Sequence, residues 1–215
     1  MALNPSKEAI LKKIRGAYTR RNTIPPEPNF SSDIYTKSDE EDLSVLFAQN
    51  FIKTKAEFFY VDGVADLQAQ LRQVLTARNI HKDIFVWEKN IIDVLEGSKI
   101  EIETSEKAFD NAEVGITSCD FLVARTGSVL LSSGTISGRR LSIYPHIHIV
   151  IATTDQIVYD IKDGLEAMKV KYPVRLPSMI CLETGPSRTA DIEKTLVLGA
   201  HGPKELLLFL LDESL

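Results

Sequence analysis

The feature that most constrains this chain is a regular alternation of helix-like and strand-like segments in its first half. The helix-like segments carry apolar residues at helical spacing, and the strand-like segments are short runs of aromatic and β-branched residues. The expected helices cover residues 43–51, 67–75 and 91–95, and the expected strands cover residues 57–61 and 84–87. Such an alternation is typical of a parallel sheet whose strands are joined by crossover helices.

Strands follow one another at shorter intervals in the second half. They are expected at residues 121–124, 128–131, 148–152, 178–182, 195–198 and 205–211, with one helix over residues 161–168. Arg125, Thr126 and Gly127 separate the first two strands, a spacing that suits a hairpin or a tight bend. The whole pattern predicts one α/β domain over residues 43–215, with three layers in which helices flank a mixed, mostly parallel sheet.

Residues 1–42 are expected to form an arm that precedes this domain. Its apolar residues recur at helical spacing beneath a basic face, which predicts a short amphipathic helix with Asn4 as its cap and Pro5 at its first position. Residues 1–21 carry six basic side chains and one acidic one, whereas residues 22–42 carry six acidic and one basic. The two segments attract each other or serve separate partners, and the helix is either a solvated surface helix or a docking helix for a partner or a membrane surface.

The acidic stretch from residue 22 to residue 42 is expected to be an extended connector. It contains three prolines and no apolar period, so it does not fit a helix. Phe30 and Tyr35 are apolar anchors within it, and such side chains are uncommon in a solvated tail. We therefore predict that the stretch packs against its own domain or against a second subunit, which leaves a homo-oligomer open.

Composition and charge exclude several classes of protein. The chain has 215 residues, of which 44% are hydrophobic and 26% are charged, as is usual for a globular protein with a real core. A net charge of −5 argues against a nucleic-acid binder that works by neutralising phosphates. The longest uninterrupted apolar run spans residues 206–211, far below the roughly 18 residues that a membrane helix needs. The N-terminus lacks an apolar signal segment, so the protein is expected in the cytoplasm.

The cysteines and histidines do not indicate a metal site. Cys119 and Cys181 are the two cysteines, whereas an iron–sulfur cluster usually needs about four, so no cofactor is expected on this chain. Both cysteines are predicted to be small buried residues. His146 and His148 alternate at strand spacing and are expected to share a face, but no third ligand lies near them. We therefore predict that they are structural histidines.

Polar side chains gather in three loops of the second half. Residues 132–140 and 183–191 each follow a strand and combine glycine, hydroxyl groups and arginine, and residues 199–203 place one imidazole between glycines. The candidate ligands of an anion are Ser133, Arg139, Arg140, Ser187, Arg188 and Thr189. Ligands of α/β sheets bind beyond the carboxyl ends of strands, so the three loops are expected to converge there into a site for a small carboxylate.

Two residues of these loops are candidates for catalysis. Glu183 can act as a nucleophile or a base, and His201 can act as a general base or donate a hydrogen bond to a carboxylate. The loops also have structural interpretations. Ser187 and Thr189 can cap a helical turn, and Arg188 can pair with Asp191 or Glu193. The 132–140 loop can be a plain turn rich in glycine and serine.

Two long segments make the chain recognisable. GITSCDFLVARTGSVLLSSGTISGRRLSIYPHIHIVIATTDQIVYDIKD is followed by TGPSRTADIEKTLVLGAHGPKELLLFLL, and together they closely resemble the LUD-domain family of lactate-utilisation proteins, in particular its C component. The match is densest from Val114 to Leu211, and the N-terminal arm is also similar. Residues 22–110 match only in general layout. The order of GPSRTADIE and GAHGP near the carboxyl end is specific to this resemblance.

The resemblance implies a fold, a function and a set of partners. Similar proteins have the NagB/RpiA/CoA transferase-like fold and are encoded with A and B components that carry iron–sulfur motifs. The set oxidises L-lactate to pyruvate. This chain lacks the ferredoxin-like cysteines of the B component, which agrees with a C component. The resemblance therefore implies a cytoplasmic, non-redox subunit that supplies a small-carboxylate site or an assembly surface, while clusters on the partner subunits pass the electrons.

Two other classes stay open. One is a free-standing enzyme of the CoA-transferase or cyclo-ligase type, which acts on a small acyl, phosphorylated or folate-like substrate with Glu183 as nucleophile or base. That role requires the Glu183 carboxylate in an open cleft. The other is a purely structural scaffold, since kinship of fold does not transfer chemistry.

Overall fold

The computed structural model describes residues 5–18, 42–106, 109, 112–192 and 195–212. The chain divides into two units, residues 1–37 and residues 38–215, and each is described by itself. In the first unit the expected amphipathic helix is present as α1, Pro5–Tyr18. The acidic stretch up to residue 41 lies outside the described residues, so the packing of Phe30 and Tyr35 stays a prediction.

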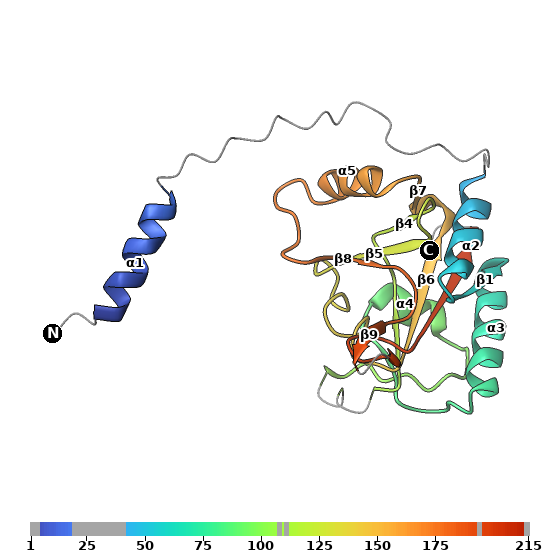
Figure 1. Cartoon of the computed structure of the whole chain (residues 1–215). Coiled ribbons are helices and arrows are strands. Elements are labelled where there is room, and N and C mark those ends of the chain that lie inside the picture. The colour runs from blue at the N-terminus through green and yellow to red at the C-terminus, as the bar shows by residue number, and fades with distance from the viewer. Residues whose placement is uncertain (1–4, 19–41, 107–108, 110–111, 193–194, 213–215) are drawn as a thin grey trace. The chain divides into compact units, whose positions relative to one another are not determined.

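A parallel five-stranded sheet forms the centre of the second unit (Figure 1). Its strands are β1 Glu57–Val61, β2 Ile84–Val86, β3 Val114–Thr117, β6 Ile147–Thr153 and β11 Glu205–Leu211, in the spatial order β1-β11-β6-β3-β2. Each strand pairs with its neighbours in parallel. Every residue of β6 is buried, as expected for a central parallel strand that is covered on both faces.

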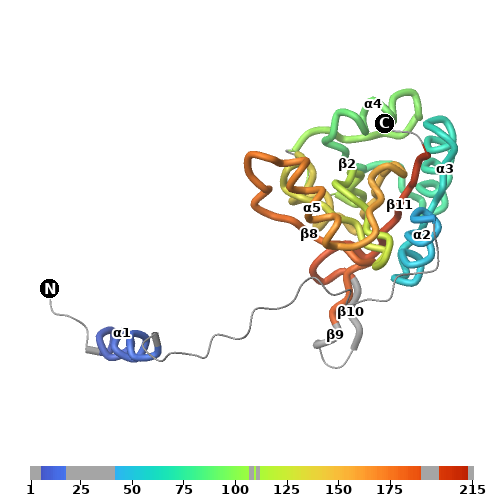
Figure 2. Tube along the Cα trace, turned by 90° about the horizontal axis from the view of Figure 1, so that it is seen from above, coloured from blue at the N-terminus to red at the C-terminus, as the bar shows by residue number. Residues whose placement is uncertain are grey.

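Helices cover one face of this sheet. They are α3 Gly63–Ala77 and α4 Lys89–Leu95, and their apolar stripes are those expected at residues 67–75 and 91–95. Leu67, Leu71 and Ile91 are fully buried and belong to one core cluster with residues from all five central strands. Figure 2 shows α3 running beside β11.

A second sheet covers the other face, together with helix α2, Leu43–Lys53. Its strands are β4 Phe121–Val123, β5 Ser128–Ser132, β7 Ile157–Val158 and β8 Ile180–Glu183, in the order β7-β4-β5-β8. Val129 of β5 and Val150 of β6 share a core cluster with Phe51 of α2, so the two sheets pack face to face. The mixed sheet expected from the sequence is thus a parallel sheet stacked on a second sheet that is mainly antiparallel.

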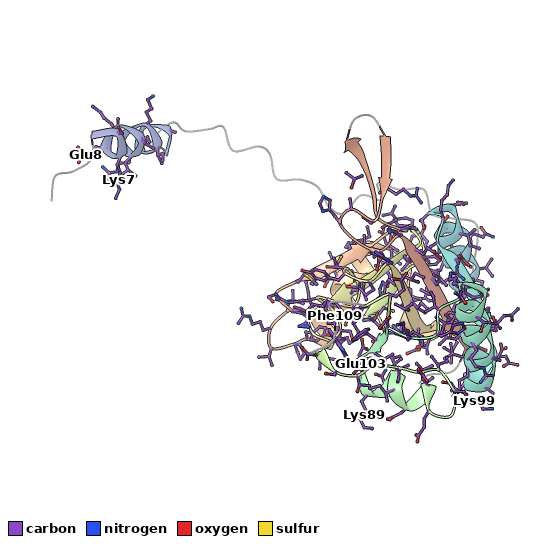
Figure 3. All side chains as sticks on the ribbon, turned by 90° about the horizontal axis from the view of Figure 1, so that it is seen from below. Lys7, Glu8, Lys89, Lys99, Glu103 and Phe109 are labelled. Carbon is purple, nitrogen blue, oxygen red and sulfur yellow. The ribbon has the colours of Figure 1, made fainter. Side chains whose placement is uncertain are left out.

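The last elements lie outside these two sheets. Helix α5, Ile161–Lys171, packs on the outer face of the second sheet, where Gly164 lies near Leu130 of β5. A short 3-10 helix, η2, covers Thr154–Gln156. Strands β9 Arg188–Ile192 and β10 Thr195–Leu198 form an antiparallel ribbon that extends away from the packed layers (Figure 3). The interpretation of Ser187 and Thr189 as helix caps is therefore wrong, because this segment enters a strand.

Gly115 allows the central sheet to approach the segment that leads into β6. A Cβ atom at this position would lie 2.3 Å from the carbonyl oxygen of Leu141 and 3.0 Å from the ring of Pro145. The sequence pattern does not predict β3, because this glycine interrupts its short apolar run. The glycine is present because the backbone of residue 141 occupies the space that a side chain would need.

We expect Gly115→Ala to lower the free energy of unfolding by about 1–3 kcal/mol, because the backbone of Leu141 must move to admit the methyl group. Urea denaturation followed by circular dichroism measures this change. Gly164→Ala is the matched control. Gly164 lies within helix α5, and a Cβ atom there would lie 3.4 Å or more from the nearest side chains of other elements. Alanine should therefore stabilise the protein by up to about 1 kcal/mol. Equal effects of the two variants would contradict the close approach.

Candidate functional site

A chain of hydrogen bonds between buried polar side chains links the two sheets. His148 of β6 has no exposed surface, and the Glu183 side chain at the end of β8 is 11% exposed. His148 Nε2 lies 2.9 Å from Oγ1 of Thr117, the last residue of β3, and His148 Nδ1 lies 2.8 Å from Glu183 Oε2. The sequence predicts a structural role for His148, but it does not predict this contact with Glu183.

The hydrogen bonds limit where the protons of this group lie. Thr117 Oγ1 lies 2.7 Å from the carbonyl oxygen of Ser118 and 2.9 Å from His148 Nε2, and its single hydrogen can serve one of the two. One hydrogen also lies between His148 Nδ1 and Glu183 Oε2, which are 2.8 Å apart. Both ring nitrogens of His148 therefore have a protein partner, as a buried imidazole requires.

A cavity of about 460 Å³ lies beside Glu183. It is lined by residues 142–143, 181–188 and 201–203. Arg188 and His201 are exposed side chains of this lining, whereas Glu183 Oε1 and Ser142 Oγ are buried and have no hydrogen-bond partner among the described residues. The cavity therefore combines cationic and hydroxyl donors on its solvent side with an acid at its buried side, and its volume suits a small molecule.

The segment from Gly185 to Arg188 is anchored on the end of α2. Gly185 has a φ of +78°, and a Cβ atom there would lie 2.7 Å from the carbonyl oxygen of Thr54. Nη2 of Arg188 donates a hydrogen bond to the same carbonyl oxygen. A guanidinium group has five N–H donors, so this bond leaves others for a ligand. Only glycine fits this turn, and the turn holds Arg188 at the cavity.

Two of the three predicted loops meet at this cavity. Ser187 N donates to Pro203 O at 2.8 Å, and Gly199 N donates to Ser187 O at 3.0 Å. The two loops meet near the amino ends of β6 and β11. Lys204 N donates a hydrogen bond to His146 O at 2.7 Å, and each of these residues directly precedes one of the two strands. The expectation of a site at the carboxyl ends of the central strands is therefore wrong for these loops, which follow β8 and precede β11.

The loop over residues 132–140 does not join them. Ser133 and Arg139 both bond to Ser178 Oγ, and the guanidinium of Arg140 lies 4.9 Å from the ring centres of Trp87 and Phe109. The predicted convergence of Ser133, Arg139 and Arg140 with the other loops is wrong. The physical reason is the antiparallel pairing of β5 and β8, which places Ser132 opposite Ile180 at the start of β8, whereas Glu183 is at its end.

Thr189 and His146 also lie outside the cavity lining. Thr189 is on β9 and is absent from the lining residues. His146 precedes β6, is exposed and has its Nδ1 3.1 Å from Glu113 Oε2. The expectation that His146 and His148 share a face is wrong, because His146 lies outside the strand. In the described part of the chain, no three His, Cys, Asp or Glu side chains form a group that could hold a metal ion.

The cysteines differ in exposure, but neither has an activated thiol. Cys119 is buried, and this burial, followed by the charge of Asp120, raises the pKa of its thiol well above the ordinary range. Cys181 is half-buried in the cavity lining, and burial followed by the charge of Glu183 raises its pKa as well. The prediction of burial is thus confirmed for Cys119, and both thiols stay protonated near neutral pH.

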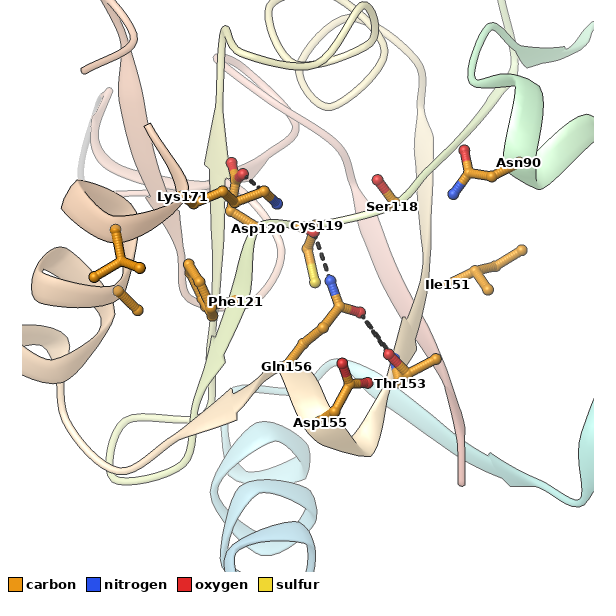
Figure 4. Close-up of a pocket in the computed structure, with 12 residues that line it drawn as sticks. Asn90, Ser118, Cys119, Asp120, Phe121, Ile151, Thr153, Asp155, Gln156 and Lys171 are labelled. Carbon is orange, nitrogen blue, oxygen red and sulfur yellow. Dashed lines mark hydrogen bonds and ion pairs between the residues drawn. The ribbon is translucent and has the colours of Figure 1, made fainter. Parts of the chain in front are cut away.

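A second cavity, of about 640 Å³, lies at the carboxyl ends of β3 and β6 (Figure 4). Its polar centre is Asp120, whose side chain has no exposed surface and whose Oδ1 accepts hydrogen bonds from Lys171 and Tyr172, each at 2.8 Å. Figure 4 shows this ion pair beside Phe121. We place the candidate site at the smaller cavity, because its acid is bonded to a buried histidine and flanked by donors for an anion, whereas Asp120 is already neutralised by Lys171.

We expect Lys171→Met to lower the free energy of unfolding by about 1–3 kcal/mol, because it removes the cation that pairs with the buried Asp120 carboxylate and leaves it the hydrogen bond from Tyr172. Burial lowers the pKa of Lys171, but the hydrogen bond and charge of Asp120 outweigh it and hold the pKa above its usual value. The stabilisation is therefore present at neutral pH and is lost only as the pH rises through the pKa of the folded protein.

Lys169→Met is the matched control on the same helix. Lys169 pairs with Glu166 at the surface, where both side chains are more than half exposed, so its loss should change stability by less than about 1 kcal/mol. Chemical denaturation of both variants at pH 7 measures the difference. If both variants were as stable as the wild type, the Asp120–Lys171 pair would not hold this part of the fold.

Fold and site together define an α/β protein in which a hydrogen-bonded acid–histidine pair lies beside a cavity lined by Ser187, Arg188 and His201. The LUD domain matches residues 45–211, and the chain belongs to this family. Lactate utilization protein C from Halalkalibacterium halodurans is 35% identical over 131 residues, which cover 60% of this chain and 53% of that protein. Lactate utilization protein C from Bacillus velezensis is 33% identical over 145 residues, which cover 66% and 57%. The chain thus spans about half the length of the curated relatives it matches.

A crystal structure of a DUF162 family protein from Deinococcus radiodurans has the same fold, with a TM-score of 0.57 at 20% identity. The superposition covers 79% of this chain and 96% of the other. It confirms the expected α/β class. In the part of the chain that the structure describes, no helix is both long and apolar enough to cross a membrane.

Proposed function

We propose that this chain is a C-type component of a cytoplasmic system that oxidises L-lactate to pyruvate together with partner subunits that carry iron–sulfur clusters. Support comes from the relatives, which are named lactate utilization protein C, and from the two cysteines of this chain, which are too few to hold a cluster. The observation that carries the proposal is the cavity that unites Arg188, Ser187 and His201 with the buried Glu183.

In this proposal the cavity binds the small carboxylate. Arg188 and Ser187 hold the carboxylate group through charge-assisted and hydroxyl hydrogen bonds, and His201 donates to it or accepts a proton. Glu183 faces the rest of the ligand from the buried side. Electrons removed from the ligand need an acceptor, and this role falls to the partner subunits.

Lactate oxidation assayed with an artificial electron acceptor tests the proposal. The purified chain is expected to show no activity alone, and addition of the two partner subunits should produce oxidation that depends on this chain. Activity of the isolated chain would favour a free-standing enzyme. Full activity of the partners without it would remove the chain from the reaction.

The geometry disfavours the alternative of a covalent acyl carrier. A nucleophilic carboxylate needs to be open to its substrate, but Glu183 Oε2 is held by His148 at 2.8 Å and its Oε1 is buried. Glu183 therefore fits the role of a hydrogen-bond partner that holds His148 better than a nucleophilic one.

We expect Arg188→Ala to weaken the binding of L-lactate about tenfold to a hundredfold, because it removes a charge-assisted hydrogen bond to the carboxylate. Isothermal titration of L-lactate, pyruvate and phosphate into the wild type and the variant measures the loss. Arg139→Ala is the control, since Arg139 is exposed and bonds to Ser178 away from this cavity. Equal affinities of wild type and Arg188→Ala would show that Arg188 only anchors its loop on Thr54.

A further inference from the structure

We propose that the cavity beside Glu183 also receives the free carboxyl end of a partner polypeptide, which adds as a short strand to the open edge of β8. The inference rests on the carboxylate-binding part of the proposed function and names a second, larger ligand for the same site. A cavity of about 460 Å³ has room for more than a three-carbon acid. Such an acid also has no backbone groups that could pair with a strand.

Strand β8 has one unpaired edge, because it lies at the end of the second sheet. Its antiparallel register with β5 places Ser132 opposite Ile180. Ser133 N donates to Met179 O at 3.0 Å, so these two residues form a hydrogen-bonded pair of the ladder. Hydrogen-bonded and non-hydrogen-bonded pairs alternate along an antiparallel ladder. The N–H and C=O groups of Met179 therefore point toward β5, whereas those of Ile180 and Leu182 point away from it.

The open edge of β8 borders the cavity. Among the described residues, no loop or strand supplies a backbone hydrogen bond to the outward groups of Ile180 or Leu182. The Leu182 side chain is 36% exposed, and residues 181–184 belong to the cavity lining. An edge of this kind binds an extended peptide through main-chain hydrogen bonds. In a parallel pairing, one peptide residue donates its N–H to Ile180 O and accepts from Leu182 N.

The segment after β8 supplies donors for a terminal carboxylate. Arg188 and His201 are exposed residues of the cavity lining, and the Arg188 guanidinium keeps N–H donors beyond the one that bonds to Thr54 O. Because this segment lies past the carboxyl end of β8, a peptide that runs parallel to β8 brings its own carboxyl end to Arg188. Charge and direction together favour the end of a chain over an internal segment.

The remaining wall of the cavity indicates the last residue of the peptide. Ile143, Leu182 and Pro203 give this wall an apolar character. Pockets beside an edge strand select the side chains of the peptide that pairs with it. The partner is therefore expected to end in an apolar residue.

Isothermal titration of the full-length protein with a synthetic peptide tests the inference. The probe is the N-acetylated tetrapeptide of Val, Thr, Val and Leu with a free carboxylate, and the control is the same peptide with a terminal carboxamide. The free acid should bind about tenfold to a hundredfold more tightly, because the carboxamide loses the charge-assisted hydrogen bonds. Arg188→Ala should remove this difference, and Arg139→Ala should keep it.

The outcomes separate the inference from the proposed function. Equal affinities of acid and carboxamide, no binding of either peptide, or a difference that survives in Arg188→Ala would overturn the inference. If L-lactate bound in the same conditions and the peptide did not, the proposed function would stand alone. If the peptide bound and L-lactate did not, the proposed function would fail and the peptide site would remain.

Methylation of the peptide amides, one at a time, tests the pairing with β8. Alternate residues of a strand face the same side, so methylation of an amide that faces β8 removes the hydrogen bond to Ile180 O and should weaken binding about twofold to tenfold. Methylation of the neighbouring amides should have a smaller effect. Equal effects at all positions would show that the edge of β8 is not used.

A matched pair of variants examines the same edge from the side of the protein. Leu182→Pro removes the outward N–H without removing a bond of the ladder to β5, and Leu182→Ala keeps that N–H. The peptide should bind Leu182→Pro about twofold to tenfold more weakly than Leu182→Ala. Equal affinities would contradict the pairing. If Leu182→Pro did not fold, the methylated peptides would still decide whether the edge is used.

Discussion

The complete burial of β6 is the constraint on which the candidate site depends. A parallel strand covered by helices on one face and by a second sheet on the other has no access to water, so a histidine within it needs protein partners for both ring nitrogens. His148 finds them in Thr117 on the neighbouring strand and in Glu183 on the second sheet. Glu183 is thereby held at the inner side of the cavity, and the loop that follows β8 begins from a fixed point.

Close backbone approaches then shape what surrounds this pair. Gly115 lets the backbone of Leu141 lie against β3, and Gly185 lets the loop after β8 close on Thr54 at the end of α2. Each contact would be lost if a Cβ atom were added. The second contact matters most for function, because the same Thr54 carbonyl oxygen also receives the hydrogen bond from Arg188 and so holds the guanidinium at the rim of the cavity.

Much of the secondary structure could be predicted from the sequence, because apolar periodicity is a local property. The helical stripe at residues 67–75 and the strand at residues 205–211 agree with α3 and β11. The short strand β3 could not be predicted, because a glycine interrupts its apolar pattern. Strand β9 could not be predicted either, because its segment is rich in residues that favour turns. Side chains that pair across long stretches of chain, such as Asp120 with Lys171, give no local signal.

The sequence by itself determined the α/β class, the buried stripes and the polar character of the loops that hold Glu183, Arg188 and His201, because residue type and spacing encode these properties. Only the tertiary structure decided which loops meet. The antiparallel register of β5 and β8 places the loop at residues 132–140 beside the start of β8, whereas Glu183 lies at the end of β8 and contacts His148. Strand register is a property of pairing between distant segments, and no single segment contains it.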